Sequence, residues 1–303
     1  MRAGILAIHV RRQTRLLALR LFRRVARRLD LDVAGRTMHS PVPDVPPSDD
    51  PIWEQPAPMP GVTIDSRVHL EYVRSVLSPY FAEFQPPLDR PHGEGEFYLD
   101  NGYYGPGDAE LLYAMIRHHK PRRLLELGAG FSTLVSARAC AVNAGEGRPV
   151  EFVSVDPEPR IRLGAATPGL TRLERRSAAA VPLEQFLELE GGDMLFVDTS
   201  HTVKLGSEVN FLVLQVLPRL RAGVLVHFHD IFLPYEYPRA WFVRGQSLAE
   251  QYLLHAFLCG NRSYEVLMAA HALARRHRKE LTLLIPSLPA VHYGPAAFWI
   301  RRC

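Results

Sequence analysis

Two short polar motifs hold the side chains best suited to chemistry. Asp-Thr-Ser-His at 198–201 follows an apolar segment, and His-Phe-His-Asp at 227–230 ends the next one. Asp198 and Asp230 offer the oxygen ligands that Mg²⁺ prefers, and mixed nitrogen and oxygen sites suit transition metals. His201, as a neutral imidazole, can accept a hydroxyl proton near neutral pH. We therefore expect Asp198 and Asp230 as metal ligands and His201 as general base; alternatively, the 227–230 motif only caps a loop.

A glycine-rich turn stands between an apolar segment and a helical pattern. Residues 124–133 read Leu-Leu-Glu-Leu-Gly-Ala-Gly-Phe-Ser-Thr. Gly128 and Gly130 allow a ligand to approach the backbone closely. A dinucleotide fingerprint would need a third glycine at the position of Thr133, and the carboxylate of Glu126 would repel a pyrophosphate. The motif predicts a site for a cationic, amino-bearing ligand; the alternative is a tight turn that binds nothing.

Another acidic residue ends the following apolar segment. Asp156 comes directly after residues 150–155, downstream of the glycine turn. An acidic residue at such a strand end can accept hydrogen bonds from two ribose hydroxyls. Asp156 is therefore a candidate nucleoside-binding residue, with a helix cap before Pro157 as the alternative.

A parallel sheet is the element that would bring these motifs together. Short apolar segments alternate with helical patterns after residue 97, which predicts strands buried on both faces. The carboxyl ends of neighbouring parallel strands meet at one crevice. We expect strands at 123–127, 150–155, 170–173, 194–197, 224–228, 264–269 and 297–301, and helices at 108–119, 133–144, 183–189, 208–220 and 247–258.

Three segments precede the sheet domain, which we place at 97–303. Residues 1–40 are expected to form a basic amphipathic helix, because arginines alternate with an apolar stripe of four-residue spacing. Residues 41–61 form a linker, since eight of the twenty residues 41–60 are proline. Residues 62–96 form a helical cap. The basic helix indicates peripheral contact with an anionic membrane or packing on protein; alternatively, Met38 is the true start.

Composition is that of a globular protein. Of the 303 residues, 47% are apolar and 22% charged, which excludes a disordered chain, a collagen and a disulfide miniprotein. The three cysteines are far apart in the sequence and form no CxxC pair, so we expect free thiols and a cytoplasmic location. No apolar run reaches the roughly 18 residues of a membrane span.

The glycine turn and the acidic strand ends resemble those of the class I S-adenosylmethionine-dependent methyltransferases. The resemblance rests on the glycine turn, on Asp156 and on Phe-Val-Asp at 196–198, and it covers about residues 97–302. It implies an α/β, Rossmann-like seven-stranded sheet, mostly parallel with an antiparallel last strand, and helices on both faces. It also implies that Glu126, Gly128 and Gly130 hold the methionine end of the cofactor, that Asp156 binds its ribose, and that the segment 100–105 with Tyr104 closes over it.

The 198–201 motif is similar to that of metal-dependent O-methyltransferases for catechols and sugars. That resemblance implies a divalent ion, Mg²⁺ or Mn²⁺, at Asp198 and Asp230, with His201 as the base; His229 stands where a carboxylate is usual. We expect methyl transfer from S-adenosylmethionine to a hydroxyl of a small molecule or sugar.

Two other functions stay open: methylation of nitrogen or nucleic acid, and a non-catalytic S-adenosylmethionine-binding module. The sequence speaks against nitrogen, because the 198–201 motif is not an Asn- or Asp-Pro-Pro-Tyr turn. The oligomeric state is left open by the sequence.

Overall fold

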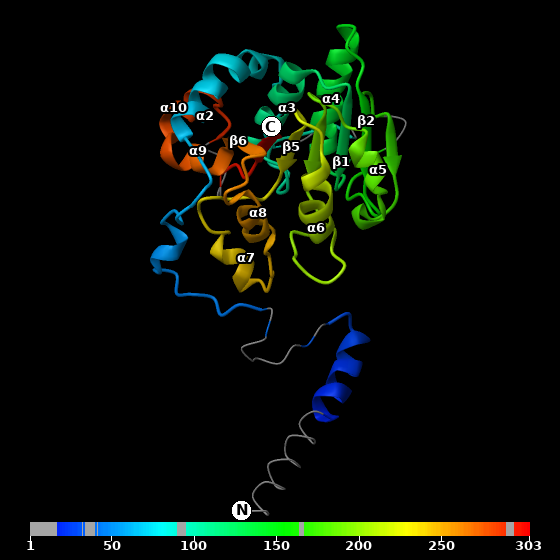
Figure 1. Cartoon of the computed structure of the whole chain (residues 1–303), viewed down its shortest axis with the longest axis vertical. Coiled ribbons are helices and arrows are strands. Elements are labelled where there is room, and N and C mark those ends of the chain that lie inside the picture. Colours follow the sequence, from blue (N-terminus) through cyan, green and yellow to red (C-terminus); the bar gives the residue numbers. More distant parts are fainter. Residues whose placement is uncertain are drawn as a thin grey trace, which may run out of the picture. The chain divides into compact units, whose positions relative to one another are not determined.

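The computed structural model describes residues 17–31, 33, 40, 42–89, 95–163, 167–288 and 294–303. The chain divides into two units, Met1–Asp44 and Val45–Cys303 (Figure 1). In the first unit residues 17–27 are helical; the earlier part of the predicted basic helix and Met38 lie outside the described residues. Among the described residues, no helix combines the length and the apolar character that crossing a bilayer requires.

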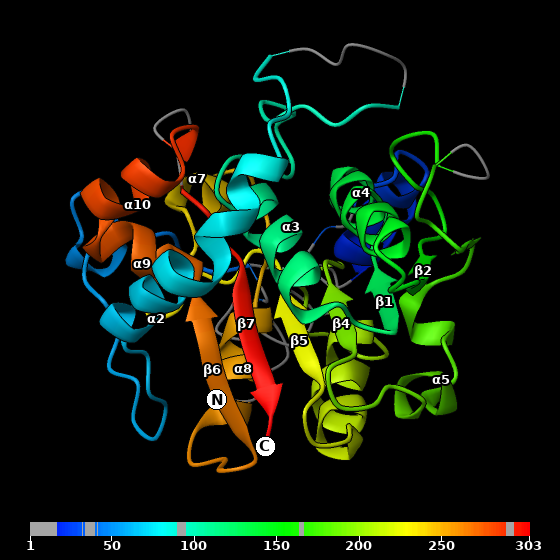
Figure 2. The same cartoon turned by 90° about the horizontal axis from the view of Figure 1, so that it is seen from above.

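A seven-stranded sheet of order β3-β2-β1-β4-β5-β7-β6 forms the centre of the second unit (Figure 2). Strand β7 pairs antiparallel with both of its neighbours, β5 and β6, and the other strand pairs are parallel. The structure therefore confirms the predicted fold class. The strands are β1 (Arg123–Leu127), β2 (Glu151–Val155), β3 (Arg172–Glu174), β4 (Met194–Val197), β5 (Leu225–Phe228), β6 (Tyr264–Ala269) and β7 (Phe298–Arg302).

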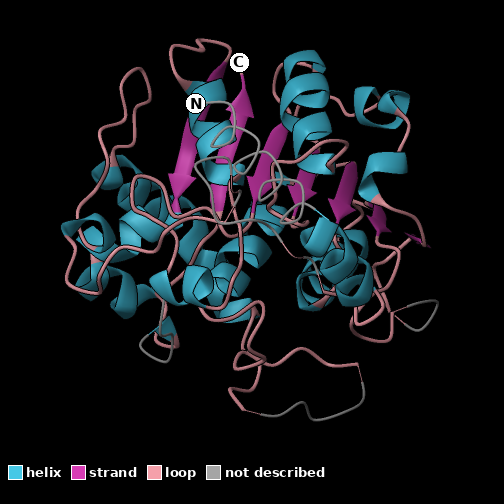
Figure 3. Cartoon of the chain, turned by 90° about the horizontal axis from the view of Figure 1, so that it is seen from below, coloured by secondary structure: helices cyan, strands magenta, loops and turns pink. Residues whose placement is uncertain are grey.

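Helices cover both faces of the sheet, because successive strand residues point to opposite sides. Leu124 and Met194 pack in one core with α2 (Ser66–Tyr72), α3 (Asp108–His119) and α4 (Phe131–Gly145). Their neighbours Leu125 and Leu195 pack in the other core with α5 (Leu183–Leu187), the helix that follows α6 (Glu208–Phe211), and α8 (Glu250–Leu258). Figure 3 shows the strands side by side with helices around them.

The remaining helical segments are short. Two are 3₁₀ segments of three residues each, η1 (Pro51–Trp53) and η4 (Ala178–Ala180). Two more, η5 (Leu212–Val216) and η6 (Leu217–Arg219), extend α6. The last three helices of the described chain, apart from α8, are α7 (Arg239–Val243), α9 (Ala270–Arg276) and α10 (Arg278–Leu284). The sequence did not predict these last three helices. The helix expected at 208–220 is present, but it changes from α to π and then to 3₁₀ geometry along its length.

The helical cap expected at 62–96 contains one continuous run of helical turns. Helix α2 passes into the π-helical η2 (Val73–Leu77) and then into the 3₁₀ segment η3 (Ser78–Glu83). Its buried side runs through Leu70, Val73 and Leu77, whereas Val68 is exposed.

The proline-rich segment 41–61 packs on the second unit over part of its length. Arg239 Nε donates to the Pro46 carbonyl at 3.1 Å, and the Ala57 amide donates to the Pro234 carbonyl at 2.7 Å. The ring of Trp53 lies 6.1 Å from that of Phe242. Residues 46–57 are therefore part of the second unit and not a detached linker as expected.

Candidate active site

The carboxyl ends of β1, β2, β4 and β5 open into a cleft of about 760 Å³. Gly128, Asp156, Asp198 and Asp230 all line it, each within two residues of one of these strand ends. The Asp198 amide donates to the Leu127 carbonyl at 2.9 Å, so the pairing of β1 and β4 continues into the cleft. The volume is typical of small-molecule and cofactor sites.

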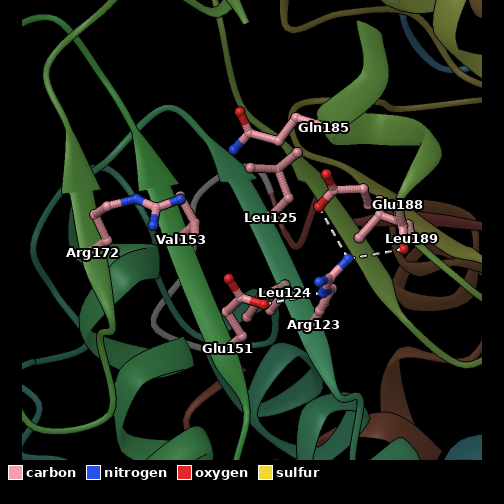
Figure 4. Close-up of a pocket in the computed structure, with 9 residues that line it drawn as sticks. All are labelled: Arg123, Leu124, Leu125, Glu151, Val153, Arg172, Gln185, Glu188 and Leu189. Atoms are coloured by element: carbon pink, nitrogen blue, oxygen red, sulfur yellow. Dashed lines mark hydrogen bonds and ion pairs between the residues drawn. The ribbon is translucent and has the colours of Figure 1, made fainter. Parts of the chain in front are cut away.

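A much smaller recess of about 40 Å³ lies where β1, β2 and β3 begin (Figure 4). Both of its acidic side chains pair with Arg123, which donates to Glu151 at 3.0 Å and to Glu188 at 3.1 Å. The recess has room for water molecules only, so the cleft is the candidate site.

The absence of a side chain has a different structural consequence at each of the two glycines of the turn. Gly128 has φ +91°, and a Cβ there would stand 1.7 Å from the Asp198 carbonyl oxygen. A Cβ on Gly130 would meet nothing within 4 Å, although Gly130 lines the cleft. Gly128 is thus required by the fold, while the missing side chain of Gly130 leaves open space that fits the predicted cofactor contact.

Glu126 lies beneath the turn, fully buried, and is not among the residues that line the cleft. Its carboxylate accepts hydrogen bonds from the hydroxyls of Ser132 (2.9 Å), Thr133 (2.6 Å) and Ser154 (2.6 Å). Burial raises its pKa to about 7, partly offset by these hydroxyls. The expected direct contact between Glu126 and the cofactor has no support in this geometry. The residue instead joins β1, β2 and the start of α4.

Asp156 lines the cleft and also fixes the turn. One carboxylate oxygen accepts from the Ala129 amide at 2.9 Å, and the other accepts from the Glu158 amide at 2.7 Å. Asp156 therefore caps a turn, not the helix that the alternative predicted, and each oxygen keeps a second lone pair for a ligand. Ribose binding by Asp156 stays a prediction.

Tyr104 is held in the wall of the cleft by Asn101. The Asn101 side chain accepts from the Tyr104 amide at 2.8 Å and donates to its carbonyl at 2.8 Å. The Tyr104 ring lies 4.8 Å from the His229 ring, and burial holds the pKa of the phenol well above its usual range. Tyr104 therefore presents a neutral ring that supports His229; its cofactor contact stays a prediction.

Asp198, His201 and Asp230 converge within the cleft. His201 Nε2 lies 3.2 Å from Asp198 Oδ1 and 3.5 Å from Asp230 Oδ2. One ligand atom from each of the three residues lies within 4.8 Å of the others. Two carboxylates and an imidazole at this spacing fit a divalent cation such as Mg²⁺ or Mn²⁺. The structure thus brings the predicted ligands and the predicted base together.

The backbone at this cluster is unusual. His201 has φ +54° and Asp230 φ +56°, two of the four non-glycine residues with positive φ in the described chain. Such conformations cost energy and occur where the surroundings enforce them, often at functional sites. Here the amides of Ala249 and Glu250 donate to the His201 carbonyl, at 2.9 and 3.1 Å.

His229 is the fourth side chain of the cluster. Its Nδ1 lies 3.5 Å from Asp198 Oδ2 and 3.7 Å from Asp230 Oδ1, and has no hydrogen-bond partner in the described part of the chain. Its Nε2 lies 3.5 Å from Asp108 Oδ2. Asp108 is the first residue of α3, and its carboxylate accepts from the amides of Ala296 and Ala297.

Charge in the cluster is coupled. Burial opposes the charged form of His201, but hydrogen bonds to Asp198 and Glu250 raise its pKa well above the usual range. Burial likewise opposes the charged form of Asp198, yet His229 and His201 lower the pKa of this carboxyl. Burial raises the pKa of Asp230 despite the two imidazoles. The carboxylates outnumber the imidazoles, and a bound cation would balance this excess.

Two residues of the site were not found by sequence reasoning. Glu250 is fully buried, and its Oε2 lies 2.8 Å from His201 Nδ1, within hydrogen-bond distance. The sequence placed it only inside an expected helix, 49 residues after His201. Asp108 carried a signal, but one that equally describes a helix cap. Neither residue follows a predicted strand, whereas the sequence patterns locate site residues at the ends of strands.

The segment after β5 divides into a packed loop and a cleft wall. Phe232, Tyr235 and Tyr237 are buried, so the first part is a packed loop. Trp241 and Arg244 line the cleft, with Gln246 and Leu248. An acceptor molecule would meet this second part.

Comparison with known proteins supplies the class of the domain. Residues 125–231 match the family model described as a methyltransferase domain. The chain contains a methyltransferase domain. The match spans β1 to the end of β5, which includes the glycine turn and both polar motifs. Together with the strand order of the sheet, the match confirms the sequence-based prediction of a class I methyltransferase.

The methyltransferase domain also has more distant relatives. An uncharacterized protein of Archaeoglobus fulgidus is 29% identical over 77 residues, which is 25% of this chain and 34% of the relative. The solved structure "cmcI-D160 Mg-SAM" covers 75% of this chain and 95% of its own, at 16% identity and a TM-score of 0.38. An O-methyltransferase from Bacillus cereus in complex with SAH covers 79% and 91%, at 15% identity and a TM-score of 0.34.

Proposed function

We propose that this protein transfers a methyl group from S-adenosylmethionine to a hydroxyl oxygen of a small molecule. The observation that carries the proposal is the convergence of Asp198, His201 and Asp230 beside the glycine turn of a methyltransferase domain. When bound, the cofactor supplies a methyl group on a positively charged sulfur. The open space at Gly130 and the carboxylate of Asp156 would hold it in the cleft.

The chain's own residues orient the acceptor and remove its proton. His201 presents Nε2 to the cleft. It would accept the hydroxyl proton there in its neutral form, which requires that a cation held by Asp198 and Asp230 offset the carboxylates that raise the pKa of His201. Asp198 and Asp230 would hold a divalent cation, which lowers the pKa of a nearby hydroxyl. Trp241 and Arg244 also line the cleft and would position the acceptor. Catalysis would rest mainly on the alignment of the two reactants.

The alternative functions fit the cleft less well. Nucleic acid is a polyanion, and binding depends on neutralising its phosphates with basic residues. The lining of this cleft instead carries more acidic than basic side chains, with Asp156, Asp198, Glu208 and Asp230 against Arg160 and Arg244. A non-catalytic module would not need a buried carboxylate behind His201.

Calorimetry followed by a turnover screen tests the proposal. We expect S-adenosylhomocysteine to bind, and labelled methyl groups to pass to members of a panel of sugars and catechols in the presence of Mg²⁺. Binding without transfer to any panel member would favour the non-catalytic module. Transfer to amines or nucleic acid in place of hydroxyls would contradict the proposed acceptor class.

We propose a second contact, between the helix at 17–27 and an anionic membrane surface. Leu17, Leu21 and Val25 are exposed on one side of it. Every charged residue of the helix is arginine: Arg20, Arg23, Arg24 and Arg27. An exposed apolar stripe beside an all-basic face complements a surface of anionic lipid. The free thiol Cys140 supports a cytoplasmic location.

Vesicle sedimentation tests the membrane contact. The full chain is expected to sediment with vesicles of phosphatidylserine and phosphatidylcholine, and to stay in solution with phosphatidylcholine alone. Replacing Leu21 and Val25 by serine should abolish sedimentation. Equal binding to both vesicles, or none to either, would contradict this proposal, and binding to RNA in place of vesicles would identify another partner.

A further inference from the structure

We propose that Glu250 is a positioning residue that holds the His201 ring with Nε2 toward the cleft. The inference rests on the proposed role of His201 as the base. Glu250 is fully buried at the first position of α8, and its Oε2 lies 2.8 Å from His201 Nδ1. Its other oxygen, Oε1, has no hydrogen-bond partner among the described residues. The His201 imidazole is thus the side-chain partner of this buried carboxylate.

The contact determines which nitrogen of His201 acts in the cleft. A carboxylate only accepts, so Nδ1 must carry a proton and donate it to Glu250. Nε2 is then the nitrogen that faces Asp198 and Asp230, at 3.2 and 3.5 Å. A ring released from Glu250 is able to turn about its Cβ–Cγ bond, which would carry Nε2 away from these carboxylates. Carboxylates behind active-site imidazoles commonly set their orientation in this way.

The backbone at the start of α8 acts on the same residue. The amides of Ala249 and Glu250 both donate to the His201 carbonyl. One end of one helix therefore fixes the ring of His201 and also its left-handed backbone. A buried carboxylate that only stabilised the start of α8 would not also have to contact the His201 imidazole.

The next residue, Gln251, has a different task and offers a matched control. Its Oε1 accepts from the Phe232 amide at 3.1 Å, and its Nε2 donates to Glu236 at 2.8 Å. It is as deeply buried as Glu250 and stands on the same helical turn. Its side chain contacts the packed loop after β5 and not the His201 ring.

The experiment compares the full-length chain with E250A, E250Q and Q251A. Proton NMR should show a downfield, slowly exchanging resonance from the His201 Nδ1 proton, assigned by its loss in H201Q. We expect it in the wild type and Q251A, shifted in E250Q, and absent in E250A. In methyl transfer, E250A should lose about 10- to 100-fold in kcat, with KM for S-adenosylmethionine unchanged, and E250Q should recover most of it.

Three results would overturn the proposal: the same resonance in E250A as in the wild type, a wild-type kcat in E250A despite its loss, or a resonance in E250Q that is not shifted. The result for E250Q keeps the test decisive if E250A does not fold, because glutamine has the shape of the glutamate side chain without its charge. If no variant and no wild-type sample transfers a methyl group, the proposed function fails, while the resonance still decides the position of the ring.

Discussion

The carbonyl oxygen of Asp198 occupies the place where a side chain on Gly128 would begin, 1.7 Å from the ideal Cβ position. The glycine turn after β1 and the acidic motif after β4 are therefore in direct contact. This contact fixes the distance between the predicted cofactor site and the candidate metal ligands, so a change at Gly128 should disturb both.

Gly128→Ala is expected to lower the free energy of unfolding by about 1–3 kcal/mol or more, because the new methyl group collides with backbone that cannot move aside. Urea unfolding measures the loss. Gly130→Ala is the matched control: it should unfold like the wild type, yet bind S-adenosylhomocysteine more weakly, since its methyl group enters the cleft. Equal stability of Gly128→Ala and the wild type would refute the close approach.

Asp156→Ala should weaken S-adenosylhomocysteine binding by about 1–3 kcal/mol, the range for hydrogen bonds to a charged group. The variant also loses the contact to the Ala129 amide, so its melting temperature must be measured beside the binding constant. Asp156→Asn keeps an acceptor oxygen, so its affinity for S-adenosylhomocysteine should lie between those of the wild type and Asp156→Ala. A dissociation constant unchanged in Asp156→Ala would sink the ribose assignment.

Glu126 should make stability depend on pH. Its folded-state pKa of about 7 lies above the ordinary value of 4.5. The folded state therefore binds the proton more tightly, and this contribution is full below about pH 4.5 and is lost as the pH rises through about 7. Measured by urea unfolding between about pH 5 and 8, the stability of the wild type relative to Glu126→Gln should fall. A difference that stays constant with pH would contradict the raised pKa.

Two truncations should separate the units of the chain. A chain that begins at Val45 keeps the contacts of Pro46 and Glu54 with the second unit. It should melt at the wild-type temperature and bind S-adenosylhomocysteine normally. A chain that begins at Met59 loses those contacts and should melt lower. If both melt alike, the proline-rich segment contributes nothing to the second unit.

Sequence patterns predicted the sheet well, because short apolar segments determine buried strands locally. The predicted strands at 123–127, 194–197 and 264–269 have the observed bounds. The strand-end rule also placed Asp198 and Asp230 together, since parallel strands end at one edge. Both results needed only neighbours in sequence and one topological rule.

What the sequence did not predict depends on how distant segments return to the sheet. Glu250 reaches His201 only because the chain after β5 folds back before α8 begins. Glu126 has the residue type of a ligand contact, but the hydroxyls of Ser132 and Ser154 enclose it. Local patterns carry no information about either arrangement.

The central claim is that Asp198, His201 and Asp230 form a metal-assisted site for methylation of a hydroxyl. The most direct measurement is the rate of methyl transfer after EDTA treatment and again after addition of Mg²⁺ or Mn²⁺, in the wild type and in His201→Gln. We predict loss with EDTA and recovery with metal, and a fall of about 10²–10⁴-fold in His201→Gln with unchanged affinity for S-adenosylhomocysteine. Transfer that neither EDTA nor the His201 substitution affects would contradict the claim.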